Sequence, residues 1–430
     1  MKKVLKIVSI AIGAMIIISA LMFATDTCPP KGPWPTPPWC SASPARNSYS
    51  VSTNAVKLSQ TKAVSMSDTW GRNYNMGMFE TTQKNISSSF DRVAELGAKE
   101  VYVNDFHLAK FGKGSDFTTT DYEIVGDTFW NDFRDEEIST KDLKKLADGA
   151  HSRGLKIGIK HNISFVDMRK YIKAGLSGDI QTGVVSDYEK FNTSHSEEWI
   201  KDYFAKWQTR LIERGSLYQS AGIDTMSISP TWMEPIFAGH EALANSLQNE
   251  LIRNVREVFR GQIYAEVNRY GFMENINGKE DWTKYDFFTN ADVIEIRVYD
   301  LPEKYRGLDA KTGIYRYLQD LNSKAGEKKV KLTIFFAPSS YTNSLNKGAL
   351  EVLDSRSEGV INVSADYQYQ NGAFEAFFAS LAGLSNIERI DVANYPWDDS
   401  LDPEVKPKLS VACTFRNKPA EEIIKSWFNK

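Results

Sequence analysis

The sequence predicts an α/β fold, a (β/α)8 TIM barrel that forms one catalytic-type domain. Short apolar runs alternate with amphipathic stretches along the chain, which is the pattern of a parallel sheet wrapped by helices. Eight such runs can be recognised, which is the number of strands in that barrel. A doubly wound open sheet is the alternative fold, but the segment "MFETTQKN" lacks the glycine-rich first turn expected of it.

Composition narrows the class of protein. The chain has 430 residues, a hydrophobic content of 42% and a formal net charge of -3. This is enough apolar material for one large core or two ordinary ones, and the small net charge argues against a nucleic-acid partner. No group of Cys or His residues has the spacing of a zinc site, so we predict no metal and no other cofactor.

The first 27 residues indicate export. Lys2, Lys3 and Lys6 precede an uncharged, mostly apolar run from Ile7 to Thr25. We expect residues 1–27 to be a signal peptide or an N-terminal signal anchor. In either case the sequence predicts an extracellular or cell-surface protein, and a retained anchor would attach it to the membrane.

Residues 28–64 are predicted to be a proline-rich linker. The stretch "CPPKGPWPTPPWCSASP" cannot form helix or central strand, because each proline lacks a donor and fixes φ. In an oxidising compartment Cys28 and Cys40 can close a small loop, which leaves Cys413 single. The barrel is then expected to occupy residues 65–430.

The barrel strands are expected at the eight apolar runs. In chain order they are "YNMGMF" from Tyr74, "EVYVNDF" from Glu100, "LKIGIKH" from Leu155, "DTMSIS" from Asp224, "QIYAEVN" from Gln262, "VIEIRVY" from Val293, "KLTIFF" from Lys331 and "ERIDVAN" from Glu388. Helical patterns such as "STKDLKKLADGAHSRG" lie between them, opened by a capping Ser or Thr and closed by Gly.

The segments that follow these strands predict a carbohydrate site, because active sites of such barrels lie at the carboxyl ends of the strands. Aromatic rings stand there beside Asn, Asp and His, and rings stack on sugar CH faces while polar groups pair with hydroxyls. Any single ring can instead be a loop anchor. The candidate substrate-binding residues are His107, Trp130, His161, Trp232, Asn268, Arg297, Tyr299, Asn394 and Trp397.

The order of motifs resembles a known family. "FDRVAELGAKEVYV", "GLKIGIKHN", "AGIDTMSIS", "NADVIEIRVYDLP" and the closing "KPAEEIIKSWF" are similar to the retaining β-mannanases of glycoside hydrolase family 113 and related barrel glycosidases. The resemblance implies a (β/α)8 barrel with one catalytic glutamate after the fourth strand and a second after the seventh. It also implies that Tyr299 lines the barrel.

In this chain other residues stand at the two positions where the resemblance would place the catalytic glutamates. After the fourth strand the chain has Ser229, Pro230 and Thr231, and after the seventh it has Phe335, Phe336 and Ala337, followed by Pro338. A glycosidase mechanism therefore needs a relocated pair of carboxylates.

Strand alternation selects the first candidates. In "QIYAEVN" the apolar face should pack on helices, so Glu266 points into the barrel near its mouth. By the same alternation Glu295 and Arg297 point inward on the next strand, with Glu295 deeper. A buried ion pair between Glu295 and Arg297 is the alternative to a catalytic role.

Two further carboxylates follow strand ends. Glu234 lies in the loop after the fourth strand, where burial against Trp232 would raise its pKa and suit it to acid/base chemistry. The alternative is a solvated loop residue. Asp105 ends the second strand beside His107, and it can instead be a loop-capping residue. His161 ends the third strand and is expected to line the cleft.

The sequence supports three functional hypotheses. The first is a secreted or surface-anchored glycoside hydrolase that acts on an oligo- or polysaccharide with a relocated pair drawn from Glu266, Glu234, Asp105 and Glu295. The second is a non-catalytic carbohydrate-binding barrel that has lost both glutamates. The third, a lyase or transglycosylase of the cell envelope, has no positive sequence support.

Overall fold

The computed structural model describes most of the barrel framework. The described residues are 57–69, 79–126, 140–165, 191, 195–229, 237–267, 285–298, 310–336, 338, 365–397 and 414–430. The strands are β1 (Thr61–Thr69), β2 (Glu100–Phe111), β3 (Tyr122–Gly126), β4 (Lys156–Ser164), β5 (Thr225–Ile228), β6 (Gln262–Val267), β7 (Val293–Val298), β8 (Val330–Ile334) and β9 (Ile387–Tyr395). The helices are α3 (Phe79–Glu95), α4 (Thr140–His151), α7 (Glu197–Ala221), α8 (Glu241–Val258), α10 (Ala310–Ala325), α12 (Tyr367–Ser380) and α13 (Pro419–Phe428).

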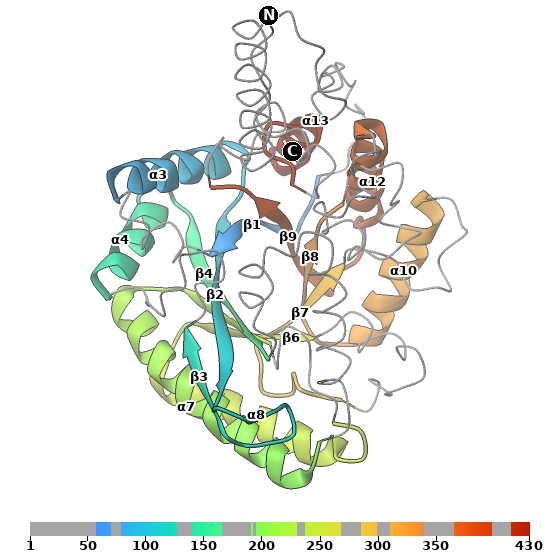
Figure 1. Ribbon diagram of the computed structural model, residues 1–430. Helices are drawn as coiled ribbons and strands as arrows, with labels where there is room; N and C mark the ends of the chain where they lie inside the picture. The colour runs from blue at the N-terminus through green and yellow to red at the C-terminus, as the bar shows by residue number, and fades with distance from the viewer. Residues whose placement is uncertain are drawn as a thin grey trace, which may run out of the picture.

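The sheet closes into a barrel of eight parallel strands. Its order is β1-β9-β8-β7-β6-β5-β4-β2-β3, and β1 also pairs with β2, so the first and last barrel strands join. β3 lies outside the barrel and pairs antiparallel with the far end of β2. Helices surround the strands in Figure 1. The predicted (β/α)8 TIM barrel is thus confirmed.

The first strand differs from the prediction. β1 spans Thr61–Thr69, whereas the run predicted as this strand begins at Tyr74, and Phe79 already starts α3. β1 was missed because its inward residues are small or polar: Ala63 packs with Tyr102 and Tyr264, and the Ser65 hydroxyl bonds Asp391. The domain boundary predicted at Ser65 therefore falls inside this strand. The other predicted runs each overlap an observed strand.

Helices α7 and α12 begin at side-chain caps that the sequence provides. The Ser196 hydroxyl accepts a hydrogen bond from the Trp199 amide at the start of α7, at 3.2 Å. Gly222 ends this helix in the left-handed region, with φ of 83°. Asp366 caps α12 in the same way, accepting from the Tyr369 amide at 2.9 Å.

The two faces of the barrel strands differ in chemistry. Outward residues are apolar and pack beneath the helices, as do Ile159, Ile263 and Leu332. Many inward residues are polar or charged, among them Lys160, Glu295, Lys331 and Asp391, all of them buried. The alternation predicted for β6 and β7 is therefore confirmed, and it points Glu266 and Glu295 into the barrel.

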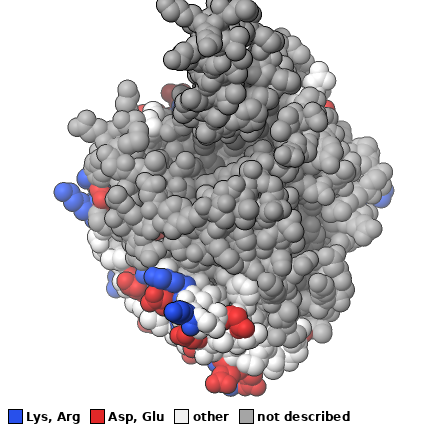
Figure 2. Space-filling model, viewed as in Figure 1, with Lys and Arg blue, Asp and Glu red and all other residues white. Residues whose placement is uncertain are grey.

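The described surface shows mixed charge. On the face in Figure 2 the described basic and acidic side chains lie next to one another. Exposed pairs on the helices have the same character, such as Lys144 with Asp148 at 2.7 Å and Lys201 with Glu197 at 2.5 Å.

Within the described ranges, no helix has both the length and the apolar character needed to cross a membrane. The predicted export segment, residues 1–27, lies outside those ranges.

Candidate functional site

The site that this fold predicts lies at the carboxyl ends of the barrel strands. Most of the segments that follow those ends are outside the described residues. They include the candidates Trp130, Trp232, Glu234, Asn268 and Tyr299, and also Pro230, Thr231 and Ala337 of the predicted replacement positions. We call this end of the barrel the mouth, and its geometry is described through the residues at the strand ends.

Glu266 and Arg297 form an ion pair at this mouth. The Arg297 Nη2 atom lies 2.8 Å from Glu266 Oε2, with 20% of the Arg297 side chain and 9% of the Glu266 side chain exposed. β6 and β7 pair Glu266 with Glu295, so Arg297 stands two residues nearer the carboxyl end than the partner of Glu266. The sequence did not predict this pair between neighbouring strands.

The surroundings of Glu266 favour its protonated form. Burial raises the pKa of Glu266 above its usual value, Arg297 and Lys160 oppose the rise, and the Glu295 carboxylate adds to it. A carboxyl with a raised pKa, close to the open end of a barrel, is suited to donate a proton. This is the property that a glycosidase acid requires.

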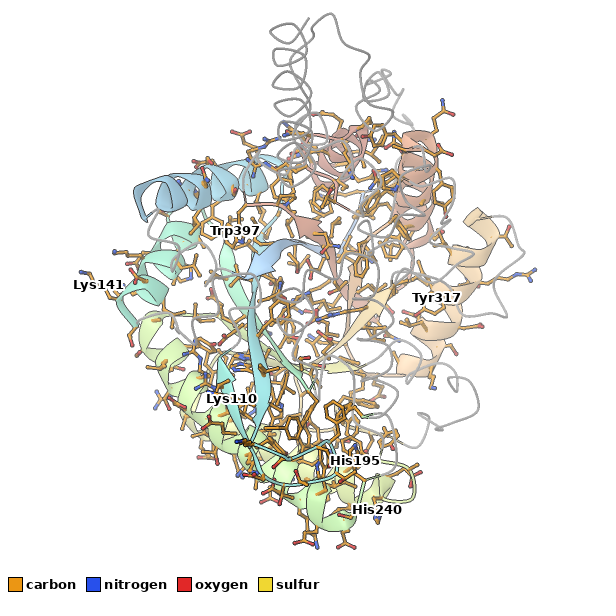
Figure 3. All side chains as sticks on the ribbon, in the orientation of Figure 1. Lys110, Lys141, His195, His240, Tyr317 and Trp397 are labelled. Atoms are coloured by element: carbon orange, nitrogen blue, oxygen red, sulfur yellow. The ribbon has the colours of Figure 1, made fainter. Side chains whose placement is uncertain are left out.

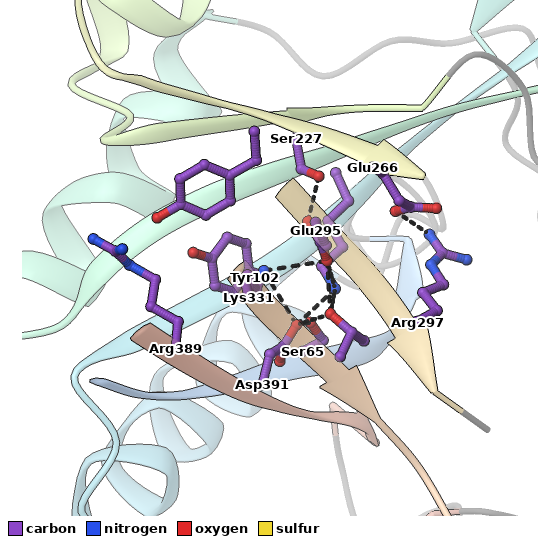
Figure 4. Close-up of polar contacts among 12 residues, drawn as sticks. Ser65, Tyr102, Ser227, Glu266, Glu295, Arg297, Lys331, Arg389 and Asp391 are labelled. Atoms are coloured by element: carbon purple, nitrogen blue, oxygen red, sulfur yellow. Dashed lines mark hydrogen bonds and ion pairs between the residues drawn. The ribbon is translucent and has the colours of Figure 1, made fainter. Parts of the chain in front are cut away.

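Below the mouth lies the interior charge network, which consists of Lys160, Glu295, Lys331, Thr333 and Asp391. Figure 4 labels Glu295, Lys331 and Asp391 of this network. Lys160 Nζ lies 2.8 Å from Glu295 Oε1 and 2.6 Å from Asp391 Oδ2. Lys331 Nζ lies 3.3 Å from the same two oxygens. The Thr333 hydroxyl lies 2.6 Å from Glu295 Oε1. Two cations thus meet two anions inside the barrel.

Glu295 is committed to this network. Burial alone would raise its pKa, but Lys160 and Lys331 hold the pKa of Glu295 well below its usual range, and the Ser227 hydroxyl also donates to it. The carboxylate has no exposed surface. The ion pair considered between Glu295 and Arg297 was wrong in its partners, because Glu295 binds the two lysines and Arg297 binds Glu266. Glu295 is therefore a buried anion held by the two lysines.

Asp105 faces away from the cleft, contrary to the prediction. Tyr102 points into the barrel, so Asp105 and His107 point outward toward α7, and His161 of β4 does the same. Arg214 Nε donates to Asp105 Oδ2 at 2.9 Å, and the Tyr218 hydroxyl donates to the same oxygen. We call this set the interlayer cluster; it consists of Asp105, His107, His161, Arg210, Arg214 and Tyr218.

The interlayer cluster is closed to solvent and holds its histidines neutral. His107 and His161 have no exposed surface, and the His107 ring packs edge-on against Trp207. Burial lowers the pKa of His161 to about 3, and burial with two nearby guanidinium groups lowers that of His107 as well. Neither histidine lines a sugar cleft. The sequence of α7 could have predicted this cluster. Arg210 and Arg214 interrupt the apolar face of that helix, and buried arginines require polar partners on the sheet beneath.

Among the described residues, one trio has the donor spacing of a metal site. His107 Nε2 and His161 Nδ1 are 3.2 Å apart, and Asp105 Oδ2 lies 3.7 and 3.9 Å from them. Arg210 Nε donates to His107 Nδ1 at 3.3 Å, which assigns the proton of that ring to Nε2, the atom a metal would need. Two buried guanidinium groups also repel a cation. The trio does not fit a metal.

Two predicted substrate-binding residues, Asn394 and Trp397, lie at the end of β9. Trp397 is 3% exposed, its ring centroid lies 6.0 Å from that of Phe90 in α3, and its carbonyl accepts from the Ser89 hydroxyl. Figure 3 shows it beside α3, so its prediction as a substrate-binding residue was wrong. The pairing of β1 with β9 shifts between Val392 and Tyr395, and Asn394 takes a φ of 69° there.

The positions of the family glutamates are partly described. Ser229 follows β5 and is buried, with its amide donating to the His161 carbonyl at 3.2 Å and its carbonyl accepting from Trp207 Nε1 at 3.3 Å. Phe336 follows β8 and packs against Phe374, at 5.0 Å between ring centroids. Neither residue supplies a carboxylate.

Comparison with known proteins supports the fold. The chain matches no known protein-family profile and no curated protein. Its structure is similar to the GH113 β-mannanase AaManA from Alicyclobacillus acidocaldarius in complex with ManMIm, with a TM-score of 0.56 and 13% identity over 87% of this chain and 98% of that one.

A second GH113 β-1,4-mannanase structure gives a TM-score of 0.55 at 14% identity, over 87% of this chain and 100% of that one. A GH5_18 variant from Streptomyces cattleya in complex with Manb1-4GlcNAc gives 0.50 at 10% identity, over 85% and 80%. The resemblance to family 113 inferred from motifs is thus confirmed at the level of the fold: this chain is a (β/α)8 barrel built like those glycosidases.

Proposed function

We propose that this protein is a glycoside hydrolase whose proton donor is Glu266. The observation that carries the proposal is the position of Glu266. It faces into the barrel near the carboxyl ends of the strands, and burial raises its pKa. The other described candidates are occupied, since Glu295 binds two lysines and Asp105 binds Arg214 outside the barrel.

The mechanism assigns Glu266 the general-acid step. Its proton passes to the glycosidic oxygen while the bond from that oxygen to the anomeric carbon breaks. A second carboxylate must act on the opposite face of the sugar. Glu234 is the remaining candidate for this role and lies outside the described residues. A separation of about 5 to 5.5 Å between the two carboxyl groups would give retention, and about 6.5 to 9.5 Å inversion.

The fold suggests which glycans to try first. Two of the similar structures are β-mannanases, and the third holds a Manb1-4GlcNAc ligand. We propose an oligo- or polysaccharide substrate and place β-1,4-linked backbones at the head of the test panel.

We also propose that the enzyme works outside the cytoplasm. The support is the sequence of residues 1–27, in which lysines precede a long apolar run. Fractionation of cells that express the full chain tests this. Protein in the medium or on the cell surface supports the proposal, and protein confined to the cytoplasm contradicts it.

The function is tested by incubating the full-length protein with a broad glycan panel and measuring new reducing ends. Wild type should release them from at least one glycan. Glu266→Gln, which keeps the shape but cannot donate the proton, should lose roughly 10²- to 10⁴-fold in rate. Exposed Glu250 of α8 provides the matched control, and Glu250→Gln should keep wild-type activity. Full activity in Glu266→Gln removes this residue from the mechanism.

A non-catalytic carbohydrate-binding barrel is the second candidate. It is favoured by one observation: among the described inward-facing residues near the mouth, Glu266 is the single carboxylate outside the interior charge network. Binding of a glycan with no new reducing ends from any member of the panel would support it. Release of reducing ends that depends on Glu266 would exclude it.

A further inference from the structure

Glu295 stands beside the proposed acid on the same face of the barrel wall. Glu266 of β6 and Glu295 of β7 are register partners, and neighbouring strands lie about 4.8 Å apart. Both side chains point into the barrel and both are buried. Figure 4 shows them next to each other on adjacent strands. Two acidic groups are therefore held together where water screens them little.

The two carboxyl groups have different neighbours. Glu295 Oε1 lies 2.8 Å from Lys160 Nζ and 3.3 Å from Lys331 Nζ. Glu266 Oε2 contacts the guanidinium of Arg297 at 2.8 Å. When two carboxyls interact, the one that its surroundings stabilise more strongly as an anion ionises first, and the other then holds its proton more firmly. Glu295 is that first group, so the proton that the pair retains belongs to Glu266.

The charged groups of the described strands act on Glu266 in opposite directions. Burial is the first cause that raises the pKa of Glu266, and the Glu295 carboxylate raises it further. Arg297, from the same strand as Glu295, and Lys160 of β4 lower this pKa. β5 lies between β4 and β6 and faces the pair with the neutral Ser227, whose hydroxyl donates to Glu295. Glu295 and Lys160 therefore connect the interior charge network to the proposed acid.

We propose that Glu295 is a positioning residue for the reaction: as a permanent anion beside Glu266, it keeps the proton on that carboxyl until the glycosidic oxygen takes it. Glu295 itself neither gives nor takes a proton. Lys160 limits the effect, because it compensates part of the charge of Glu295 at 2.8 Å. The inference rests on the proposed function for the catalytic role of Glu266. Its consequence is that the interior charge network sets the pH range in which the acid is active.

The test uses double variants that each remove one anion and one cation, so that the remaining charges of the network stay paired. Glu295→Gln with Lys331→Met removes the carboxylate beside Glu266 and leaves Lys160 with Asp391. Asp391→Asn with Lys331→Met is the matched control, because it removes as many charges and leaves Glu295 with Lys160. Lys160→Met with Asp391→Asn leaves Glu295 with Lys331. Thermal unfolding of the full-length protein shows which variants are folded.

The titration of Glu266 is followed without substrate, by infrared spectroscopy of protonated carboxyl groups, and Glu266→Gln identifies its band. Its midpoint should move to lower pH in Glu295→Gln with Lys331→Met, and to higher pH in Lys160→Met with Asp391→Asn. The matched control should titrate close to wild type. A role in packing alone would lower the stability of all three double variants and leave every midpoint in place.

The pH profile of cleavage provides the second readout. A general acid is active when protonated, so the basic limb of kcat/KM against pH should move in the same directions as the infrared midpoints. At a fixed pH on that limb, kcat/KM should be severalfold lower in Glu295→Gln with Lys331→Met than in the matched control. If the variants that carry Lys331→Met do not fold, Lys160→Met with Asp391→Asn and the single variant Glu295→Gln decide.

The inference is overturned if the infrared midpoint in folded Glu295→Gln with Lys331→Met equals that of the matched control or lies at higher pH. The two readouts separate this outcome from failure of the proposed function. Midpoints that move as predicted, with no cleavage of any glycan, would leave the control of Glu266 by Glu295 and exclude the hydrolase. Cleavage that depends on Glu266, with midpoints that do not move, would leave the hydrolase and exclude the role of Glu295.

Discussion

Two buried polar clusters share strand β4 but lie on opposite sides of the barrel wall. Lys160 and His161 are consecutive in β4, yet Lys160 joins the interior charge network and His161 joins the interlayer cluster. The interior network leads upward to Glu266 and Arg297, which are partly exposed at the mouth. The interlayer cluster is closed by α7 and Trp207. A residue at a strand end therefore belongs to the candidate site only when its side chain faces into the barrel.

Electrostatics separates the two clusters further. Burial raises the pKa of Glu266 above its usual value, and Arg297 opposes part of this rise. In the interlayer cluster burial also acts to raise the pKa of Asp105, but the Arg214 guanidinium and the hydrogen bond from the Tyr218 hydroxyl hold it well below its usual range. One carboxyl is suited to give up a proton during a reaction, and the other to remain a permanent anion.

The largest expected loss of stability is in the interlayer cluster. Arg214→Met leaves Asp105 buried without its cation, and removing one partner of a buried pair costs roughly 3 to 5 kcal/mol of unfolding free energy. Urea unfolding measures it. The double variant Asp105→Asn with Arg214→Met should recover part of the loss. A single variant that loses no more than the usual range for exposed pairs, about 0 to 1 kcal/mol, would show that this pair is not a buried one.

A loss of similar or smaller size is expected at Trp397. Its ring packs on Phe90 in the layer between barrel and helices, so Trp397→Ala removes core contacts and should cost about 3 to 5 kcal/mol. Glycan affinity of the folded variant should equal that of wild type, as measured by calorimetry below its unfolding temperature. Weakened binding with unchanged stability would restore the sequence-based prediction that Trp397 contacts substrate.

Stability should also depend on pH through His161. The unfolded chain takes up this proton near pH 6.5, while the folded protein takes it up only near pH 3. More protons are bound in the unfolded state between these values, so stability falls as the pH is lowered through the window, by at most about 1.4 kcal/mol per pH unit for one group. His161→Asn, which retains an acceptor for His107, should reduce the slope of unfolding free energy between about pH 6 and 4.5. An unchanged slope would mean that His161 titrates normally in the folded state.

The smallest effect separates the two partners at the mouth. Arg297 opposes the rise in the pKa of Glu266, so Arg297→Met should raise that pKa further. A general acid is active when protonated, and kcat/KM falls as the pH rises through its pKa. The basic limb of kcat/KM against pH should therefore move to higher pH in Arg297→Met. A limb that stays in place would mean that another group controls it.

Much of the fold was predictable because the outward faces of the strands are apolar. Ile157, Ile263 and Leu332 pack beneath helices, and such runs mark strands in the sequence. β1 was missed because its inward residues, Ala63 and Ser65, are small or polar, so it lacks an apolar run. β3 depends on a long-range pairing with the far end of β2, which strand propensity does not show.

The candidate site was predictable only in part. Alternation along β6 correctly turned Glu266 inward, and the same test applied to β2 would have turned Asp105 and His107 outward. The partner of Glu266 was not predictable, because it depends on the register between β6 and β7 rather than on either segment alone. The contacts of Glu295 with lysines of β4 and β8 also depend on how strands far apart in the sequence are placed in the barrel.

In the proposed hydrolase the carboxylate inside the barrel, Glu266, carries the chemistry, and the one outside it, Asp105, does not. The most direct measurement is the rate of reducing-end release from the best glycan by Glu266→Gln and Asp105→Asn beside wild type, at a temperature where all three are folded. We predict a loss of roughly 10²- to 10⁴-fold for Glu266→Gln and a rate close to wild type for Asp105→Asn. A large loss in folded Asp105→Asn with an active Glu266→Gln would contradict the account.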